Sequence, residues 1–105
     1  MFGKKGDHSA QYLGGYGAAQ TISASVSANN ITNPGMYTWG SYQSVPQDLP
    51  NVAMAGAMEV KCPRDNMVIQ TVYFNGNSTI PPSVYERIKW GDSWFNWGKV
   101  VLQMT

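Results

Sequence analysis

The sequence has few charged residues. Charged side chains make up 12% of its 105 residues, whereas they make up roughly 25% of average soluble domains. The formal net charge is only +1, and a nucleic-acid site needs clustered Lys and Arg to neutralise phosphates. The composition therefore argues against a nucleic-acid partner. It favours a largely uncharged polar surface, which suits subunit contacts and sugar recognition.

Cysteine and histidine occur once each. A single cysteine, Cys62, excludes an intrachain disulfide, and its place in an alternating run predicts a small buried hydrophobic residue. His8 has no second histidine or cysteine at the spacing of metal ligands. We therefore expect no metal site and no cofactor.

Long hydrophobic runs are missing. No stretch approaches the roughly 18 apolar residues of a membrane-spanning segment. The first residues are polar and rich in glycine, unlike the charged and apolar regions of a signal peptide. We therefore expect neither membrane insertion nor secretion by a signal peptide.

The carboxylates show no catalytic pattern. Glycoside hydrolysis needs two converging carboxylates roughly 5 to 10 Å apart. Glu59 alternates with apolar neighbours of a predicted strand, while Asp65 and Asp92 lie in predicted turns. Glu86 and Arg87 are adjacent on a predicted strand and point to opposite faces. We therefore expect a protein that is not an enzyme and has no catalytic residues.

Turn signals occur regularly from Asn29 onward, separated by β-rich runs of about five to eight residues, a pattern typical of a mainly β, small antiparallel domain. Met67 to Phe74 is the best candidate for a central strand. Both of its faces are mainly apolar, so we expect cover on both sides. The one candidate helix, near Gln47 to Ala57, is interrupted by Pro50.

Residues 1–28 differ from the rest in composition. They are rich in Gly, Ala and Ser and contain few large apolar residues, so they cannot build a core alone. We expect residues 1–28 to be an extended attachment or stalk segment and residues 29–105 to be an autonomous domain. Tyr12, Leu13 and Tyr16 are the predicted attachment or subunit contacts of the first part.

The strongest local signal is a hairpin near the carboxyl terminus. Gly91-Asp92-Ser93 is a set of turn formers between two runs of β-branched and aromatic residues, which predicts a β-hairpin. An aromatic patch, which we expect to be divided between core and surface, lies within it: Trp90, Trp94, Phe95 and Trp97.

Such patches stack on the faces of pyranose rings, and they also build cores and interfaces. We expect Trp90 and Trp97 to be core residues and Trp94 and Phe95 to form an exposed contact surface. Three aromatic residues from the first hairpin region are expected to join that surface: Tyr37, Trp39 and Tyr42.

Tyr85 and Arg87 lie two residues apart and therefore on one face of their strand. One interpretation is a contact with a ligand, in which Arg87 binds hydroxyls or phosphate and Tyr85 stacks. The other is structural, in which Arg87 covers an aromatic ring and bonds loop carbonyls. We favour the structural interpretation and keep both.

Together these residues resemble a known family. The Tyr85-x-Arg87 pair, the short turn, the Trp94-x-x-Trp97 pair and the apolar strand after it resemble the closing segment of the knob-like repeats of pyocin and bacteriophage tail fibres.

Upstream segments fit the same pattern. Asn30 to Tyr37 is similar to the opening N-x-T-x-P-G-x-Y of these repeats, Pro50-Asn51 and Gly56 to Val60 to their loop and second strand, and Val68-Ile69-Gln70 to their apolar-Gln strand. The resemblance spans about residues 29–101.

The resemblance implies a knob-like β domain that forms a homotrimer in a head or tail fibre of a phage or phage-derived particle. Such a virion component assembles in the bacterial cytoplasm, with other virion proteins and bacterial surface polysaccharide as partners. The alternative is a purely structural connector or capsid-decoration protein without a ligand of its own.

Overall fold

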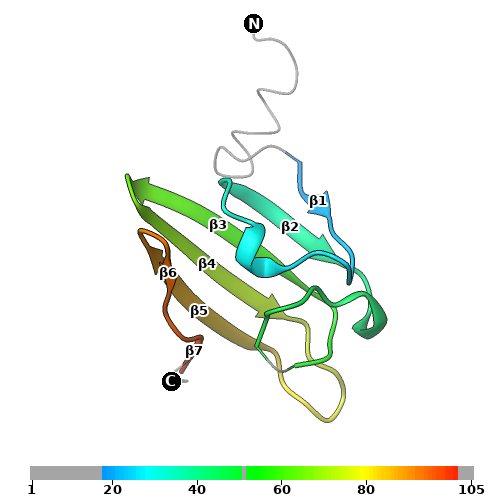
Figure 1. Ribbon diagram of the computed structural model, residues 1–105. Coiled ribbons are helices and arrows are strands. Elements are labelled where there is room, and N and C mark those ends of the chain that lie inside the picture. The colour runs from blue at the N-terminus through cyan, green and yellow to red at the C-terminus, as the bar shows by residue number, and fades with distance from the viewer. Residues whose placement is uncertain (1–17, 51, 102–105) are drawn as a thin grey trace, which may run out of the picture.

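The computed structural model describes residues 18–50 and 52–101 (Figure 1). This part of the chain contains seven strands and two short 3-10 helices, so the mainly β prediction is confirmed. The described residues of the candidate helix near Gln47 to Ala57 are not helical. In chain order the elements are β1 (Gln20–Thr21), η1 (Ala28–Asn30), β2 (Gly35–Trp39), η2 (Tyr42–Ser44), β3 (Gly56–Arg64), β4 (Met67–Phe74), β5 (Ser83–Trp90), β6 (Ser93–Trp94) and β7 (Gly98–Val100).

The strands form one open sheet in the order β1-β2-β3-β4-β5-β6, and β7 also pairs with β5. Neighbouring strands are antiparallel except β1, which runs parallel to β2. The sheet is therefore mixed rather than wholly antiparallel. β4 lies between β3 and β5 with the bounds predicted for the central strand. The turn predicted at Gly91 is also present, with a φ of 61° at that glycine.

The core lies on one face of the sheet, which we call the covered face. Alternate residues of the central strands point to it, because successive side chains of a strand lie on opposite faces. Loop residues from before η1 and after η2 pack over them, and Figure 1 shows η1 and these loops in front of the sheet. The buried apolar cluster consists of Ile31, Tyr37, Trp39, Met58, Val60, Val72 and Phe74.

The opposite face, which we call the open face, is much more exposed. Ile69 and Ile88 are half-buried there, while Tyr73 is 41% and Trp90 49% exposed. The expected cover on both sides of β4 is therefore wrong for the single chain. The expected core position of Trp90 is also wrong, since Trp90 falls on the alternate position of β5 that points away from the core. The Arg64 guanidinium lies 5.5 Å from its ring centroid.

Cys62 is exposed, so its prediction as a buried residue is wrong. The buried alternation of β3 ends at Val60, and the pairing of β3 with β4 shifts register between Lys61 and Arg64. The last residues of β3 therefore leave the core. The Cys62 Sγ donates a hydrogen bond to the Thr32 carbonyl at 3.3 Å.

Residues 18–28 contact the domain closely. β1 pairs with β2, Ile22 and Val26 pack against the core, and Ala28 is fully buried. Tyr12, Leu13 and Tyr16 lie outside the described residues. The division at residue 28 concerns which part of the chain folds alone, and it stays a prediction.

These contacts lead to a test by truncation. We expect a variant that begins at residue 18 to keep a cooperative β fold, since it retains β1, Ile22 and Val26. A variant that begins at residue 29 loses these side chains, and Ile22 and Val26 are partly buried, whereas full burial of such a side chain contributes about 1.5 to 3 kcal/mol. It should therefore unfold at a clearly lower urea concentration when followed by far-ultraviolet circular dichroism. Equal stability of the two variants would support autonomous folding from residue 29.

Candidate functional site

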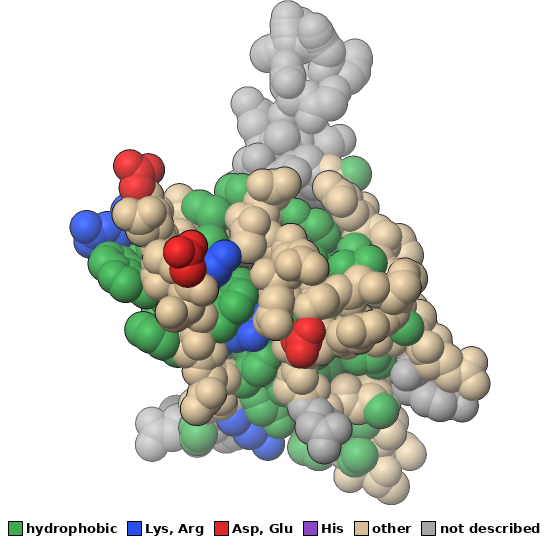
Figure 2. Space-filling view, in the orientation of Figure 1, with side chains coloured by type: hydrophobic (Ala, Val, Ile, Leu, Met, Phe, Trp, Pro, Cys, Tyr) green, Lys and Arg blue, Asp and Glu red, His purple; other side chains and the backbone are tan. Residues whose placement is uncertain are grey.

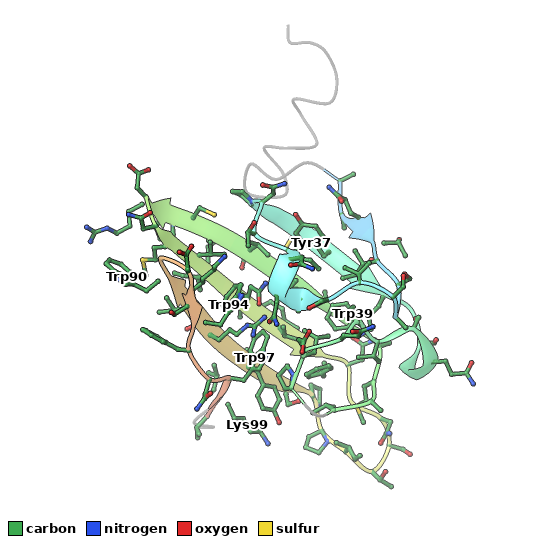
Figure 3. All side chains as sticks on the ribbon, viewed as in Figure 1. Tyr37, Trp39, Trp90, Trp94, Trp97 and Lys99 are labelled. Carbon is green, nitrogen blue, oxygen red and sulfur yellow. The ribbon has the colours of Figure 1, made fainter. Side chains whose placement is uncertain are left out.

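Arg87 is the centre of the site. β5 projects it onto the covered face, where it is 7% exposed. Its Cζ lies 3.9 Å from the ring centroid of Trp94 and 4.4 Å from that of Trp97. Figure 3 shows both tryptophans projecting over the sheet from the segment between β5 and β7. Because indole faces attract cations, Arg87 covers aromatic rings as the structural interpretation predicts.

Gln70 links Arg87 to the loop around η1. The Arg87 Nε donates a hydrogen bond to the Gln70 Oε1 at 2.8 Å. The Gln70 Nε2 in turn donates to the carbonyls of Ala28 and Ile31, both at 2.8 Å. The loop carbonyls are thus bonded by Gln70, which is fully buried, and not by Arg87. Sequence reasoning placed Gln70 in a strand but missed this role.

The two tryptophans also hold loops. The Trp94 Nε1 donates to the Asn29 carbonyl at 3.3 Å, and the Trp97 Nε1 donates to the Asp48 carbonyl at 3.0 Å. The side chains that surround Arg87 therefore fasten η1 and the loop at residue 48 to the sheet. Each ring contributes a face to the guanidinium and an N–H group to a loop.

The charge of Arg87 is incompletely compensated. Its Nη2 is buried and has no hydrogen-bond partner among the described residues. Burial lowers the pKa of Arg87 to about 10, and Asp48 partly opposes this effect. Burial of a charge disfavours the charged form, so the protein here keeps a cation at an energetic cost.

An open cleft of about 370 Å³ lies where η1, the loop at residue 48 and the segment after β6 meet. Phe95 at its rim is 57% exposed. On the face of the molecule in Figure 2, few of the visible side chains are charged. The residues that line the cleft are Asn29, Asp48, Leu49, Arg87, Trp94, Phe95, Asn96 and Trp97.

The structure brings Arg87, Trp94 and Phe95 together in this cleft. Trp97, expected in the core, is half-buried and lines the cleft. Tyr85 is half-buried and packs edge-on against Phe74, with 5.8 Å between the ring centroids. Tyr85 does not line the cleft.

Two other predicted contact residues are core residues. Trp39 is 2% exposed and donates to the Met54 carbonyl, and Tyr37 is 6% exposed and donates to the Asn33 carbonyl. The expectation that they lie on an exposed contact surface is wrong, because their strand turns both toward the covered face. The side chain of Tyr42 lies outside the described part of the structure.

Within residues 18–50 and 52–101, no group of three or more His, Cys, Asp or Glu side chains is placed to hold a metal ion. In the same ranges no helix has the length and apolar character needed to cross a membrane. His8 lies outside these ranges.

The hydrogen bonds that link Gln70 to Arg87 and to the loop around η1 give a stability prediction. We expect Gln70→Met to lower the free energy of unfolding by roughly 2 kcal/mol or more, because Arg87 Nε and the Ile31 carbonyl lose their partner and each orphaned group costs about 1 to 3 kcal/mol. The Ala28 carbonyl keeps its hydrogen bond from the Ile31 N–H. Urea unfolding measures the loss. The matched control is Gln20→Met, which changes an exposed glutamine of β1 and should be nearly neutral. Equal effects at both positions would contradict the inference that the hydrogen bonds of Gln70 stabilise the fold.

The fold is similar to that of a solved structure, a C-terminal fragment of the R1 pyocin fibre of P. aeruginosa. The similarity has a TM-score of 0.63 at 21% sequence identity and covers 78% of this chain. It covers 21% of the fibre fragment, so the chain spans about a fifth of that fragment's length. No family model matches the sequence, and no curated protein matches it. The likeness shows the fold alone: this chain has a fold that occurs in a pyocin fibre.

Proposed function

We propose that the chain is a module of a phage-type head or tail fibre and that it contacts bacterial surface glycans through the cleft. The observation that carries this proposal is the exposed Phe95 beside exposed amide and carboxylate groups, on a base fixed by Arg87, Trp94 and Trp97. The likeness to a pyocin fibre fragment supports the fibre role.

The cleft has the features of a sugar contact. Phe95 offers an aromatic face, which stacks on the apolar face of a pyranose ring. Asn29, Asp48 and Asn96 are exposed around it and supply both donors and acceptors for hydroxyl groups. Small-ligand sites are typically concave, with an apolar lining and a few placed polar groups. This arrangement favours binding of a polar, uncharged surface.

The open face supports association with further copies of the chain. Ile69, Tyr73, Ile88 and Trp90 share that face and are half-buried or exposed in the single chain. Contiguous exposed apolar surface marks interaction sites. Three chains that pack through this face would form the homotrimer that the resemblance implies, in a virion with other virion proteins as neighbours.

We expect a trimer in dilute solution. Multi-angle light scattering should give a mass near three times the 11.5 kDa of one chain. Ile88→Asp should shift the mass toward the monomer, because a buried unpaired carboxylate is costly. Ile80→Asp changes an exposed residue between β4 and β5 and serves as the control. A monomeric mass for the unchanged protein at micromolar concentration would remove this support.

The binding role is tested by adsorption. We expect fluorescently labelled protein to adsorb to cells of some strains in a bacterial panel and to be displaced by soluble polysaccharide from the same strains. Incorporation into particles without adsorption to any cells would favour the alternative, a purely structural connector or capsid-decoration protein.

A further inference from the structure

We infer that the cleft binds one neutral pyranose unit with neighbouring free hydroxyls, rather than an acidic sugar. This inference rests on the proposed contact with surface glycans and names the class of sugar. It follows from the aromatic rim, from the polar groups beside it, from the charges in the cleft and from its size.

The aromatic platform is Phe95. Its ring is 57% exposed, although exposed aromatic surface is unfavourable in water. Its backbone is fixed, since the Phe95 N–H donates to the Ile88 carbonyl at 2.9 Å. The preceding residue, Trp94, is stacked on Arg87. The ring is therefore exposed on a rigid support, as a surface for the apolar face of a sugar requires.

The polar groups beside Phe95 are free for a ligand. The backbone N–H and C=O of Asn29 are both bonded, to Ser27 and Trp94, whereas its side-chain amide forms no hydrogen bond within the described residues. The same holds for the side chain of Asn96. Asp48 accepts a hydrogen bond from Ser27 on Oδ2, which leaves Oδ1 as an acceptor.

Two amides and one carboxylate oxygen suit sugar hydroxyls. Each hydroxyl both donates and accepts, the amide supplies both functions and the carboxylate accepts strongly. Two neighbouring hydroxyls can therefore bond a carboxylate and an amide at the same time. Asp48 has a φ of 65°, a conformation that Asp and Asn adopt more readily than most residues, so the backbone fixes where its side chain begins.

The charges disfavour an acidic sugar. Recognition of a carboxylate or phosphate typically uses the planar N–H fork of an arginine. Here the Arg87 guanidinium is stacked on two indole rings, its Nε is bonded to Gln70 and its Nη2 is buried. The charged group among the exposed side chains of the cleft is Asp48, which repels an anion.

Arg87 still favours oxygen atoms in the cleft. Its positive charge lies beneath the rim, and its Nη2 lacks an acceptor. The volume of about 370 Å³ is near the lower end of the range for small-ligand sites, which leaves room for one sugar ring.

Nuclear magnetic resonance titration tests the ligand class. The probes are methyl glycosides of neutral hexoses and 6-deoxyhexoses, compared with methyl glycosides of uronic acids and with sugar phosphates. We expect at least one neutral glycoside to shift the signals of Phe95, Asn96 and the Asn29 side chain. A single sugar ring is expected to bind with a Kd on the order of 1 mM.

Substitutions in the cleft test whether Phe95 and Asp48 contact the sugar. Phe95→Ala should weaken binding of the neutral glycoside about tenfold, which corresponds to roughly 1.4 kcal/mol. Asp48→Asn keeps a residue that tolerates the positive φ, and it should weaken binding by removing the carboxylate. The control is Ile80→Ala, which truncates an apolar side chain of similar exposure outside the cleft and should leave the affinity unchanged.

Each contrary result has a defined meaning. Tighter binding of uronic acids or sugar phosphates would overturn the neutral class, and shifts confined to residues outside the cleft would overturn the site. Absence of binding by all neutral glycosides would overturn the inference, and the fibre proposal would stand if the same protein still adsorbs to cells. Absence of both glycoside binding and adsorption would overturn both.

Discussion

The structure depends on one buried cation. A charge in the protein interior costs several kcal/mol unless it is paired and hydrogen-bonded. The charge of Arg87 is partly compensated by the faces of Trp94 and Trp97 and by a hydrogen bond to Gln70, while its Nη2 has no hydrogen-bond partner among the described residues. Each of these three partners uses its remaining polar group to bond a loop carbonyl. Solvation of the guanidinium and attachment of the loops are thus achieved by the same side chains.

This coupling positions the cleft. Asn29 and Asp48 carry the carbonyls that the two indoles bond, and Phe95 follows Trp94 directly. The exposed side chains at the rim are therefore one residue or one hydrogen bond away from the two indoles that stack on the buried cation. Lysine at position 87 would not reproduce the arrangement, because an ammonium is a point charge that lacks the planar face needed to stack on two rings. The proposed binding residues are therefore positioned by an interaction beneath the surface.

The positions of turns and strands could be predicted from local sequence. The face of the sheet that the loops cover could not. The turn at Gly91 and the strand from Met67 to Phe74 follow from turn formers and β-branched runs, which act within a few residues. Alternation shows that Trp39 and Trp90 occupy fixed faces of their strands, but it does not show which face the loops cover. That choice depends on contacts such as Gln70 with Ala28, which are 42 residues apart in sequence.

The two faces of the sheet separate two roles. The covered face carries the core and, at one end, the cleft, whereas the open face carries apolar residues that are half-buried or exposed in the single chain. Arg87 and Ile88 are neighbours on β5 and point to these opposite faces. Association through the open face would therefore leave the cleft of each copy accessible. If each cleft binds a sugar as proposed, several weak contacts on one assembly would act together, since linked sites raise avidity by roughly 10²- to 10⁴-fold without any new contact.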